Sequence, residues 1–316
     1  MNKEKGSDIL DKLKADIILS GAGVRGCYEA GCLSNLNEHY DFSKAIGTSA
    51  GSILCALLKV NYTMDELKKI MCSVNYKKMM NINSKIPFIG KYINLFAKKG
   101  LYSTDYIENW INSLLKAKGK TTFGDIPDGE LNIVLTDITS KRTVVFPRDL
   151  HLYNINPKTF SISKAVAGSI AIPMFFQPLR LEWVDNDGNK KVSYFCDGGL
   201  LQNYFLEFYD NVETYDKPIF GIHFKQEDNI ITKKTSILSY LQMLINTVVD
   251  NNKEEYLFNK NLIYSFGLIS DGINVSSTNF DLNYKDCLDM YNSGDKQARQ
   301  YLESKDFKNY ILKYNK

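Results

Sequence analysis

Ser49 is the residue whose type and spacing most directly suggest chemistry. It stands at the centre of the pentapeptide Gly47-Thr48-Ser49-Ala50-Gly51. A Gly-x-Ser-x-Gly turn between a strand and a helix can lift the serine hydroxyl out of the strand end, because glycines lack the Cβ atoms that would crowd the turn. A strand-like run, "FSKAIGTS", leads into this serine, and an apolar helix-like run, "AGSILCALLKV", follows it. We therefore interpret residues 47–51 as a nucleophile elbow.

A nucleophilic serine needs a base, and histidine is the first type to consider. The sequence contains His39, His151 and His223 as its three histidines. The chain order Ser49, Asp197, His223 would fit a Ser-Asp-His triad. His223, however, lies inside the strand-like run "IFGIHFK", whereas a catalytic histidine is expected on a loop beyond a strand. A packed strand histidine is therefore the favoured interpretation, with the triad kept as an alternative.

Asp197 offers a base of another kind. It ends the β-rich run "KVSYFCD" and precedes Gly198 and Gly199. An aspartate before two glycines is usually a turn with a local hydrogen bond. Its place at the carboxyl end of a predicted strand nevertheless puts the carboxylate at the sheet edge where we expect the elbow.

The run "GAGVRG" at residues 21–26 is a second glycine-rich turn. It fits the Gly-x-Gly-x-x-Gly pattern of dinucleotide sites, and Asp41 follows at about the 20-residue offset of the ribose-binding acid. Asp41 precedes the second predicted strand instead of ending it, which disfavours that hypothesis. The alternative is that backbone N–H groups at a helix start stabilise another anion, such as an oxyanion. Arg25 opposes the helix dipole there, which indicates either an anionic substrate or a salt bridge to a neighbouring loop.

A sheet has to position these turns. Strands are predicted at residues 15–20 and 42–49 and helices at residues 26–40 and 50–60, the first helix with one apolar face formed by Cys27, Ala30, Leu33 and Leu36. Two successive strand–turn–helix units predict parallel strands whose turns meet at one edge. The remaining predicted strands are 131–138, 143–147, 191–197 and 217–224, and the remaining predicted helices are 103–119, 161–173 and about 236–258.

Composition excludes several classes of protein. The 316 residues are 44% hydrophobic with a formal charge of +3, so no global basic field argues for nucleic acid. The six cysteines are scattered, without the spacing of a zinc site or a disulfide framework. The charged N-terminus does not resemble a signal peptide, and no apolar run reaches the length of about 20 residues that spans a bilayer. We expect a cytoplasmic protein that is soluble or peripheral on membranes, with no metal and no cofactor.

The three motifs together, "GAGVRG", "GTSAGS" and "DGG" in that order, resemble the patatin-like phospholipase family. Two further stretches are similar to that family: "SIAIPMFFQP" (169–178) and "LLQNYF" (200–205). The resemblance extends to "STNFDLNYKDCLDMYNSGDKQARQYL" near the C-terminus and so covers roughly residues 15 to 305. We expect one patatin-like domain over residues 1–316, with a core at about 15–210 and a C-terminal extension at about 211–316.

The resemblance implies a fold and an activity. The fold is a three-layer α/β sandwich with a central, mostly parallel sheet flanked by helices. The activity is that of a lipid acyl hydrolase of the phospholipase A2 or lysophospholipase type, in which a Ser-Asp dyad works without a histidine. The catalytic residues would be Ser49 and Asp197. The oxyanion hole would come from Gly21, Ala22, Gly23, Val24, Arg25 and Gly26.

The resemblance also has departures and consequences for partners. Ala22 stands where the family commonly has a third glycine, and Phe205 replaces the usual proline after Asn203. From Leu67 to Thr104 the chain carries eight lysines and no acidic residue, which indicates either an anionic membrane surface as partner or a solvated cap over the site. A phospholipid or other lipid ester is the expected substrate, and the resemblance leaves room for an activator protein. A catalytically silent lipid-binding protein is a further alternative, which the presence of both dyad residues disfavours.

Overall fold

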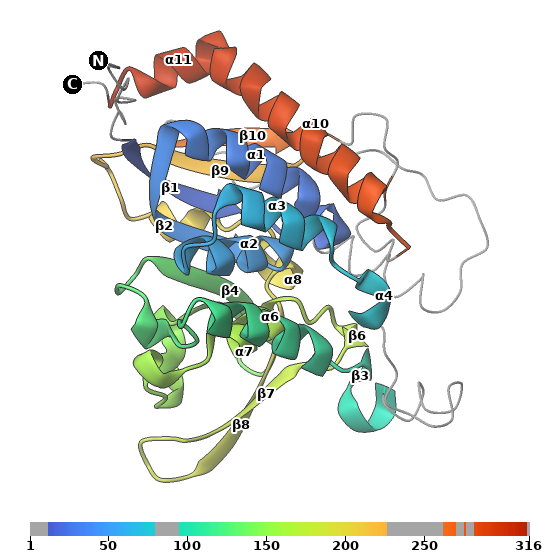
Figure 1. Ribbon diagram of the computed structural model, residues 1–316. Helices are drawn as coiled ribbons and strands as arrows, with labels where there is room; N and C mark the ends of the chain where they lie inside the picture. The colour runs from blue at the N-terminus through green and yellow to red at the C-terminus, as the bar shows by residue number, and fades with distance from the viewer. Residues whose placement is uncertain (1–11, 80–94, 226–261, 270–274, 276–280, 315–316) are drawn as a thin grey trace, which may run out of the picture.

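The computed structural model describes residues 12–79, 95–225, 262–269, 275 and 281–314 (Figure 1). Its strands are β1 (Leu13–Leu19), β2 (Tyr40–Thr48), β3 (Gly100–Tyr102), β4 (Leu131–Asp137), β5 (Arg142–Phe146), β6 (Met174–Phe176), β7 (Leu179–Val184), β8 (Lys190–Asp197), β9 (Ile219–Phe224) and β10 (Ile263–Leu268). Its α-helices are α1 (Gly26–His39), α2 (Ala50–Lys59), α3 (Met64–Cys72), α4 (Tyr76–Met79), α6 (Asp105–Ala117), α7 (Ile162–Ser169), α8 (Gly199–Gln202), α10 (Tyr284–Glu303) and α11 (Lys305–Ile311). Short 3-10 turns are η1 (Gly23–Arg25), η2 (Phe123–Asp125), η3 (Arg148–Tyr153), η4 (Pro157–Thr159) and η5 (Leu206–Tyr209).

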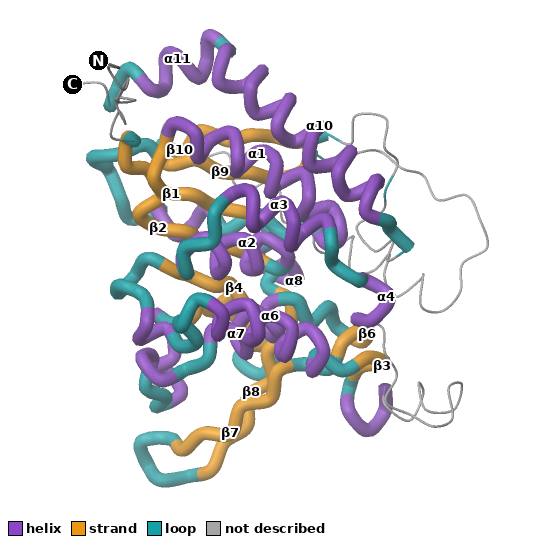
Figure 2. The backbone as a smooth tube through the Cα atoms, in the orientation of Figure 1, coloured by secondary structure: helices purple, strands orange, loops and turns teal. Residues whose placement is uncertain are grey.

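In the described part of the chain, eight strands form one mixed sheet. Their order is β10-β9-β1-β2-β4-β8-β7, and β5 also pairs with β4. The strands from β10 to β4 are parallel to one another, which confirms the expectation drawn from the two strand–turn–helix units. β5, β8 and β7 join antiparallel to their neighbours. Figure 2 shows β7 and β8 leaving the sheet as a two-stranded ribbon.

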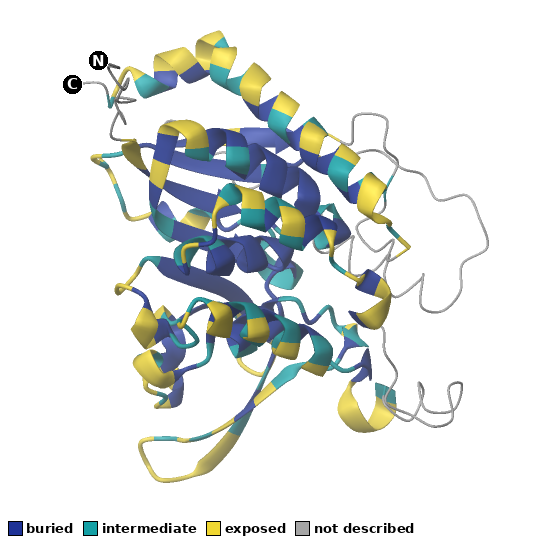
Figure 3. Cartoon of the chain, viewed as in Figure 1, coloured by how far each residue is buried: buried dark blue, intermediate teal, exposed yellow. Residues whose placement is uncertain are grey.

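The central strands are buried on both faces (Figure 3). In β1, Ile17 and Leu19 lie in the larger core, under α1, α2, α3, α6, α7 and α10, whereas Ile18 lies in a smaller core with Phe205 and Tyr209. Successive side chains of a strand point to opposite faces, so a strand covered on both sides needs an unbroken apolar run. This confirms the predicted α/β class, a mostly parallel sheet flanked by helices.

Helix α1 differs from the prediction of a single apolar face, because it is buried almost all around. Its outer side is covered by α10, which comes from the C-terminal extension. A Cβ added at Gly31 would lie 1.9 Å from the carbonyl oxygen of Tyr291, and one at Gly294 would lie 2.0 Å from that of Tyr28. These glycines therefore allow the two helix backbones to touch.

Most predicted elements are present, with one helix shorter than expected. The predicted helix at 161–173 ends at Ser169 in the structure, because the chain then turns into β6, which pairs with β3. The predicted helix at about 236–258 lies outside the described residues. Among the described helices, none is long and apolar enough to cross a bilayer.

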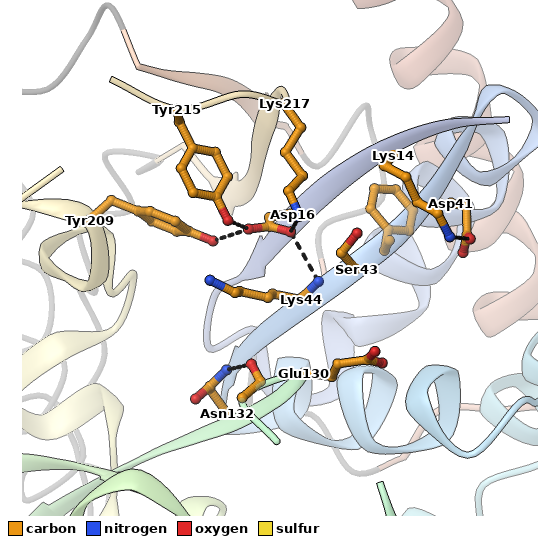
Figure 4. A network of polar contacts seen from close by, with 12 residues as sticks. Lys14, Asp16, Asp41, Ser43, Lys44, Glu130, Asn132, Tyr209, Tyr215 and Lys217 are labelled. Carbon is orange, nitrogen blue, oxygen red and sulfur yellow. Dashed lines mark hydrogen bonds and ion pairs between the residues drawn. The ribbon is translucent and has the colours of Figure 1, made fainter. Parts of the chain in front are cut away.

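A buried carboxylate, that of Asp16, anchors residues 209–217, which follow the motif Asp197-Gly198-Gly199 in the chain (Figure 4). Asp16, the middle residue of β1, has no exposed surface. Its Oδ2 accepts hydrogen bonds from the hydroxyls of Tyr209 (2.7 Å) and Tyr215 (2.6 Å). Its Oδ1 accepts the backbone N–H of Lys44 at 3.0 Å and lies 3.9 Å from the Lys217 ammonium. These contacts satisfy a charge that would be costly to bury alone, and they tie residues 209–217 to the sheet.

Candidate active site

Ser49 occupies a strained turn between β2 and α2. Its φ of 50° and ψ of −122° lie in a region that residues with a side chain rarely adopt, at a cost of order 1–3 kcal/mol. Close packing holds the turn: a Cβ at Gly47 would lie 2.6 Å from the oxygen of Gly51, and a Cβ at Gly51 would lie 2.7 Å from the oxygens of Leu19 and Ser20. Thr48 ends β2 and Ala50 begins α2, so the hydroxyl stands at the amino end of a helix.

The serine hydroxyl donates a hydrogen bond to Asp197 Oδ2 at 2.7 Å. The other carboxylate oxygen, Oδ1, accepts the N–H of Gly199 at 2.7 Å, from the first turn of α8. Ser49 is 4% exposed and Asp197 6% exposed. Burial raises the pKa of Asp197 from 3.8 to about 6, and the hydrogen bonds from Ser49 and Gly199 oppose that rise. At pH 7 the carboxyl is therefore mainly ionised and ready to accept a proton.

Asp197 reaches this position by a route that the sequence did not reveal. Its strand, β8, runs antiparallel to β4, yet its carboxyl end lies at the edge of the sheet that holds the elbow, as expected. β8 overlaps β4 over three residues, with Asp197 opposite Leu135, while Thr48 lies opposite Val134 on the other side of β4. This short overlap brings Asp197 level with the elbow despite the reversed strand direction.

Ser169, the last residue of α7, supports the elbow and was missed as a site residue. Its Oγ accepts the backbone N–H of Ser49 at 2.9 Å and donates to the carbonyl oxygen of Val134 at 2.7 Å. The side chain is fully buried. The sequence signal for Ser169 was its place at the start of "SIAIPMFFQP". That stretch is similar to the family, but it does not indicate a contact with Ser49, which lies 120 residues away in the chain.

The glycine-rich loop packs directly against Ser49. A Cβ added at Gly21 would lie 3.3 Å from the Cβ of Ser49 and 2.2 Å from Oδ1 of Asn203. Asn203 connects the loop to the segment that follows Asp197. Its backbone carbonyl accepts the Gly21 N–H at 2.9 Å, and its side-chain amide donates to the Gly21 oxygen at 3.3 Å. Asn203 thus holds the two motifs together through its backbone and its side chain.

The conformation of the loop explains which residue types it accepts. Gly23 has a φ of 58°, in the region that favours glycine, and begins η1. Ala22 has a φ of −123°, which any residue adopts, so the departure from three glycines costs the loop nothing in backbone strain. The first N–H groups of a helical turn lack acceptors within the turn, and here they belong to Gly23 and Val24. Arg25 donates its own N–H to the Ala22 oxygen at 3.2 Å.

Two helix starts converge beside Ser49. A Cβ at Gly26, the first residue of α1, would lie 3.3 Å from the Cβ of Ala50, the first residue of α2. Helix N-termini carry partial positive charge and favour an anion. The Arg25 guanidinium lies over the Phe224 ring, 4.4 Å from its centroid. The arrangement can activate a serine hydroxyl and stabilise the negative charge that its attack creates.

The sequence model of the family described as "Patatin-like phospholipase" matches residues 17–208, more than half of the chain. The chain belongs to the patatin-like phospholipase family. Family membership supports a lipid acyl hydrolase. The match includes all three motifs and also Ser169 and Asn203, the residues that tie the motifs together.

Two sequence relatives and two solved structures are similar to this patatin-like chain. It is 29% identical over 296 residues to the uncharacterized protein YqhO of Bacillus subtilis (strain 168), covering 91% of this chain and 98% of YqhO. It is 25% identical over 292 residues to the probable lipid hydrolase 463L of Invertebrate iridescent virus 6, covering 89% and 87%. Among solved structures, VipD from Legionella pneumophila gives a TM-score of 0.47 at 15% identity, covering 92% of this chain and 67% of VipD.

A second solved structure is the complex of ExoU with SpcU from Pseudomonas aeruginosa. ExoU gives a TM-score of 0.46 at 16% identity, covering 92% of this chain and 51% of ExoU. The patatin-like chain therefore spans about half the length of ExoU.

The two alternative sites suggested by the sequence are not assembled. His223 lies on β9 and stacks on Tyr204 with ring centroids 4.9 Å apart, while the direct hydrogen bond between Ser49 and Asp197 leaves no room for an imidazole between them. Asp41 lies at the amino end of β2, where its carboxylate pairs with Lys14, so the dinucleotide hypothesis lacks its ribose-binding acid at the glycine loop. Among the described residues, no group of three or more His, Cys, Asp or Glu could hold a metal ion.

Proposed function

We propose that this protein is a lipid acyl hydrolase of the phospholipase A2 or lysophospholipase type, and that Ser49 and Asp197 form its catalytic dyad. Membership of the family supports lipid ester hydrolysis in general. The observation that carries the finer proposal is the 2.7 Å hydrogen bond from Ser49 Oγ to Asp197 Oδ2, in a site where both groups are nearly buried.

In the first half-reaction, Ser49 Oγ attacks the ester carbonyl carbon as its proton moves to Asp197 Oδ2. The carbonyl oxygen becomes an oxyanion, which the N–H groups of Gly23 and Val24 and the amino end of α2 would stabilise. The intermediate expels the alcohol, which takes the proton back from Asp197. An acyl group then remains on Ser49.

In the second half-reaction, water attacks the acyl carbon and gives a proton to Asp197. The tetrahedral intermediate expels Ser49 Oγ, which recovers that proton, and the fatty acid leaves. Esters should be better substrates than amides, because an alcohol leaving group needs less protonation before the bond breaks than an amine does.

An exposed apolar and basic surface at β3 and β6 supports an encounter with lipid. Phe96 is 84% exposed and precedes Lys98 and Lys99, which are also exposed. They lead into β3, whose Gly100 pairs with Met174, another exposed apolar residue. An apolar side chain beside lysines suits an anionic membrane surface, where each lysine contributes about 1 kcal/mol.

The test is hydrolysis of a medium-chain p-nitrophenyl ester and of mixed phospholipid vesicles by the wild type and by Ser49→Ala, Asp197→Asn and His223→Ala. The first two variants should lose activity by about 10³-fold or more, because each removes half of the dyad. His223→Ala should keep it, since His223 is stacked on Tyr204 away from the dyad. Equal inactivity of a folded His223→Ala would support a triad. A wild type inactive on every ester would leave lipid binding without catalysis.

A further inference from the structure

Glu29 is a buried carboxyl group that the proposed mechanism does not use. It lies in the first turn of α1 and has no exposed surface. Its Oε1 accepts the hydroxyl proton of Ser20 at 2.9 Å, whereas Oε2 has no hydrogen-bond partner within the described residues. An ionised carboxylate with an unsatisfied oxygen is very costly in such a place, while a neutral acid is much less so.

The contact between Glu29 and Ser20 closes the glycine-rich loop. Ser20 immediately precedes Gly21, and its own N–H donates to the Ile222 oxygen at 3.0 Å. The loop therefore packs against Ser49 at Gly21, and the residue just before Gly21, Ser20, is hydrogen-bonded to Glu29. Any change at Glu29 acts on the segment that carries the proposed oxyanion donors.

The groups around Glu29 come from several elements. Arg25 of η1 lowers its pKa by charge attraction, as does the hydrogen bond from Ser20, but burial dominates and raises the pKa of Glu29 to about 8. Cys32 on α1, Cys55 on α2 and Tyr204 beyond α8 also lie within electrostatic reach, and all three are neutral at pH 7 because burial raises their pKa values.

We infer that Glu29 is a positioning residue that must be uncharged: its neutral carboxyl group holds Ser20 and the glycine-rich loop, and its ionisation puts negative charge behind the donors that receive the oxyanion. This inference rests on the proposed function. Two like charges close to the same loop repel each other, so ionisation of Glu29 opposes the step in which the oxyanion forms.

A bell-shaped pH profile follows. Asp197 must be ionised, so activity is present above its pKa of about 6 and is lost as the pH falls through that value. Glu29 must be protonated, so activity is present below its pKa of about 8 and is lost as the pH rises through that value. The two limbs belong to two different buried carboxyl groups.

The experiment compares kcat for a p-nitrophenyl ester between pH 5 and 10 in the wild type, Glu29→Gln and Ser20→Ala, with buffer hydrolysis subtracted. Wild-type kcat should fall by about tenfold or more above pH 8. Glu29→Gln, which cannot ionise, should stay active at pH 7, keep the acid limb and lose the alkaline limb. Ser20→Ala removes a hydrogen bond that favours the charged form, so its alkaline midpoint should move to higher pH. An unchanged alkaline limb in Glu29→Gln, or a downward shift in Ser20→Ala, overturns the inference.

A second readout does not depend on turnover. The folded-state pKa of Glu29 is raised, so its contribution to stability is present below the ordinary pKa of a glutamate and is lost as the pH rises through about 8. The urea midpoint of the catalytically dead Ser49→Ala variant should therefore fall as the pH rises from 4.5 to about 8. The urea midpoint of the double variant Ser49→Ala/Glu29→Gln should fall less over the same range. Equal slopes would overturn the inference even in an active enzyme. An inactive wild type with unequal slopes would overturn the proposed function and with it the catalytic part of the inference.

Discussion

Replacing Ser169 by alanine tests whether the elbow is held from outside its own turn. The substitution removes the acceptor of the Ser49 N–H and the donor to the Val134 oxygen, so two buried backbone groups each lose a hydrogen bond. Losing the partner of a buried polar group costs about 1–3 kcal/mol. Two such groups are affected here, and water or local relaxation should restore part of the lost hydrogen bonding, so the free energy of unfolding should fall by about 2–4 kcal/mol. The strained φ of Ser49 would then relax, and kcat for ester hydrolysis should fall about 10- to 100-fold.

Ser163→Ala is the matched control, because Ser163 lies on the same helix and is 2% exposed. Its hydroxyl bonds to Ser161 Oγ at 2.9 Å and does not touch the elbow. The free energy of unfolding of this variant should fall by less than about 1 kcal/mol, and its kcat should not change. Urea denaturation and ester hydrolysis measure the two quantities. A Ser169→Ala enzyme that matches Ser163→Ala in kcat while remaining folded would refute the view that α7 supports the nucleophile.

Two further substitutions test backbone arguments. Gly23→Ala should lower the free energy of unfolding by about 1–2 kcal/mol and kcat at least tenfold, because an alanine disfavours a φ of 58° and would turn the loop N–H groups. Ala22→Gly, at an ordinary φ, should keep its kcat within about twofold of the wild type. The reverse ranking of the two kcat values would contradict the assignment of the loop. Gly31→Ala should lower the free energy of unfolding by about 3 kcal/mol or prevent folding, because its Cβ would lie 1.9 Å from the Tyr291 oxygen. A Gly31→Ala variant as stable in urea as the wild type would show that α1 and α10 do not touch as described.

The sequence predicted those parts of the site that are contiguous in the chain. Each motif carries its own turn chemistry, so the residue pattern alone places the elbow around Ser49, and likewise the loop at residues 21–26, between a strand and a helix. The residues that join the motifs could not be found in this way. Ser169 and Asn203 act through hydrogen bonds to segments 120 and 182 residues away, and an isolated serine or asparagine has no spacing that predicts such a bond.

The same limit applies to the fold. The periodicity of α1 predicted one buried face, but a helix that is covered later by α10 needs small residues on its outer side, and glycines such as Gly31 carry no periodic signal. The direction of β8 was also hidden, because the residues of a strand alternate in the same way whichever way the strand runs. The register of β8 on β4 then places Asp197, and register depends on contacts that are distant in sequence.

Burial puts the two carboxyl groups of the site into opposite charge states at neutral pH. Asp197 has its pKa raised from 3.8 to about 6, a gain in proton affinity of about 3 kcal/mol, which makes it a better base for Ser49 while leaving it about 90% ionised at pH 7. Glu29 has its pKa raised to about 8 and stays neutral beside the loop that receives the oxyanion. In the proposed mechanism, a Ser-Asp site thus keeps negative charge where the proton goes and excludes it where the oxyanion forms.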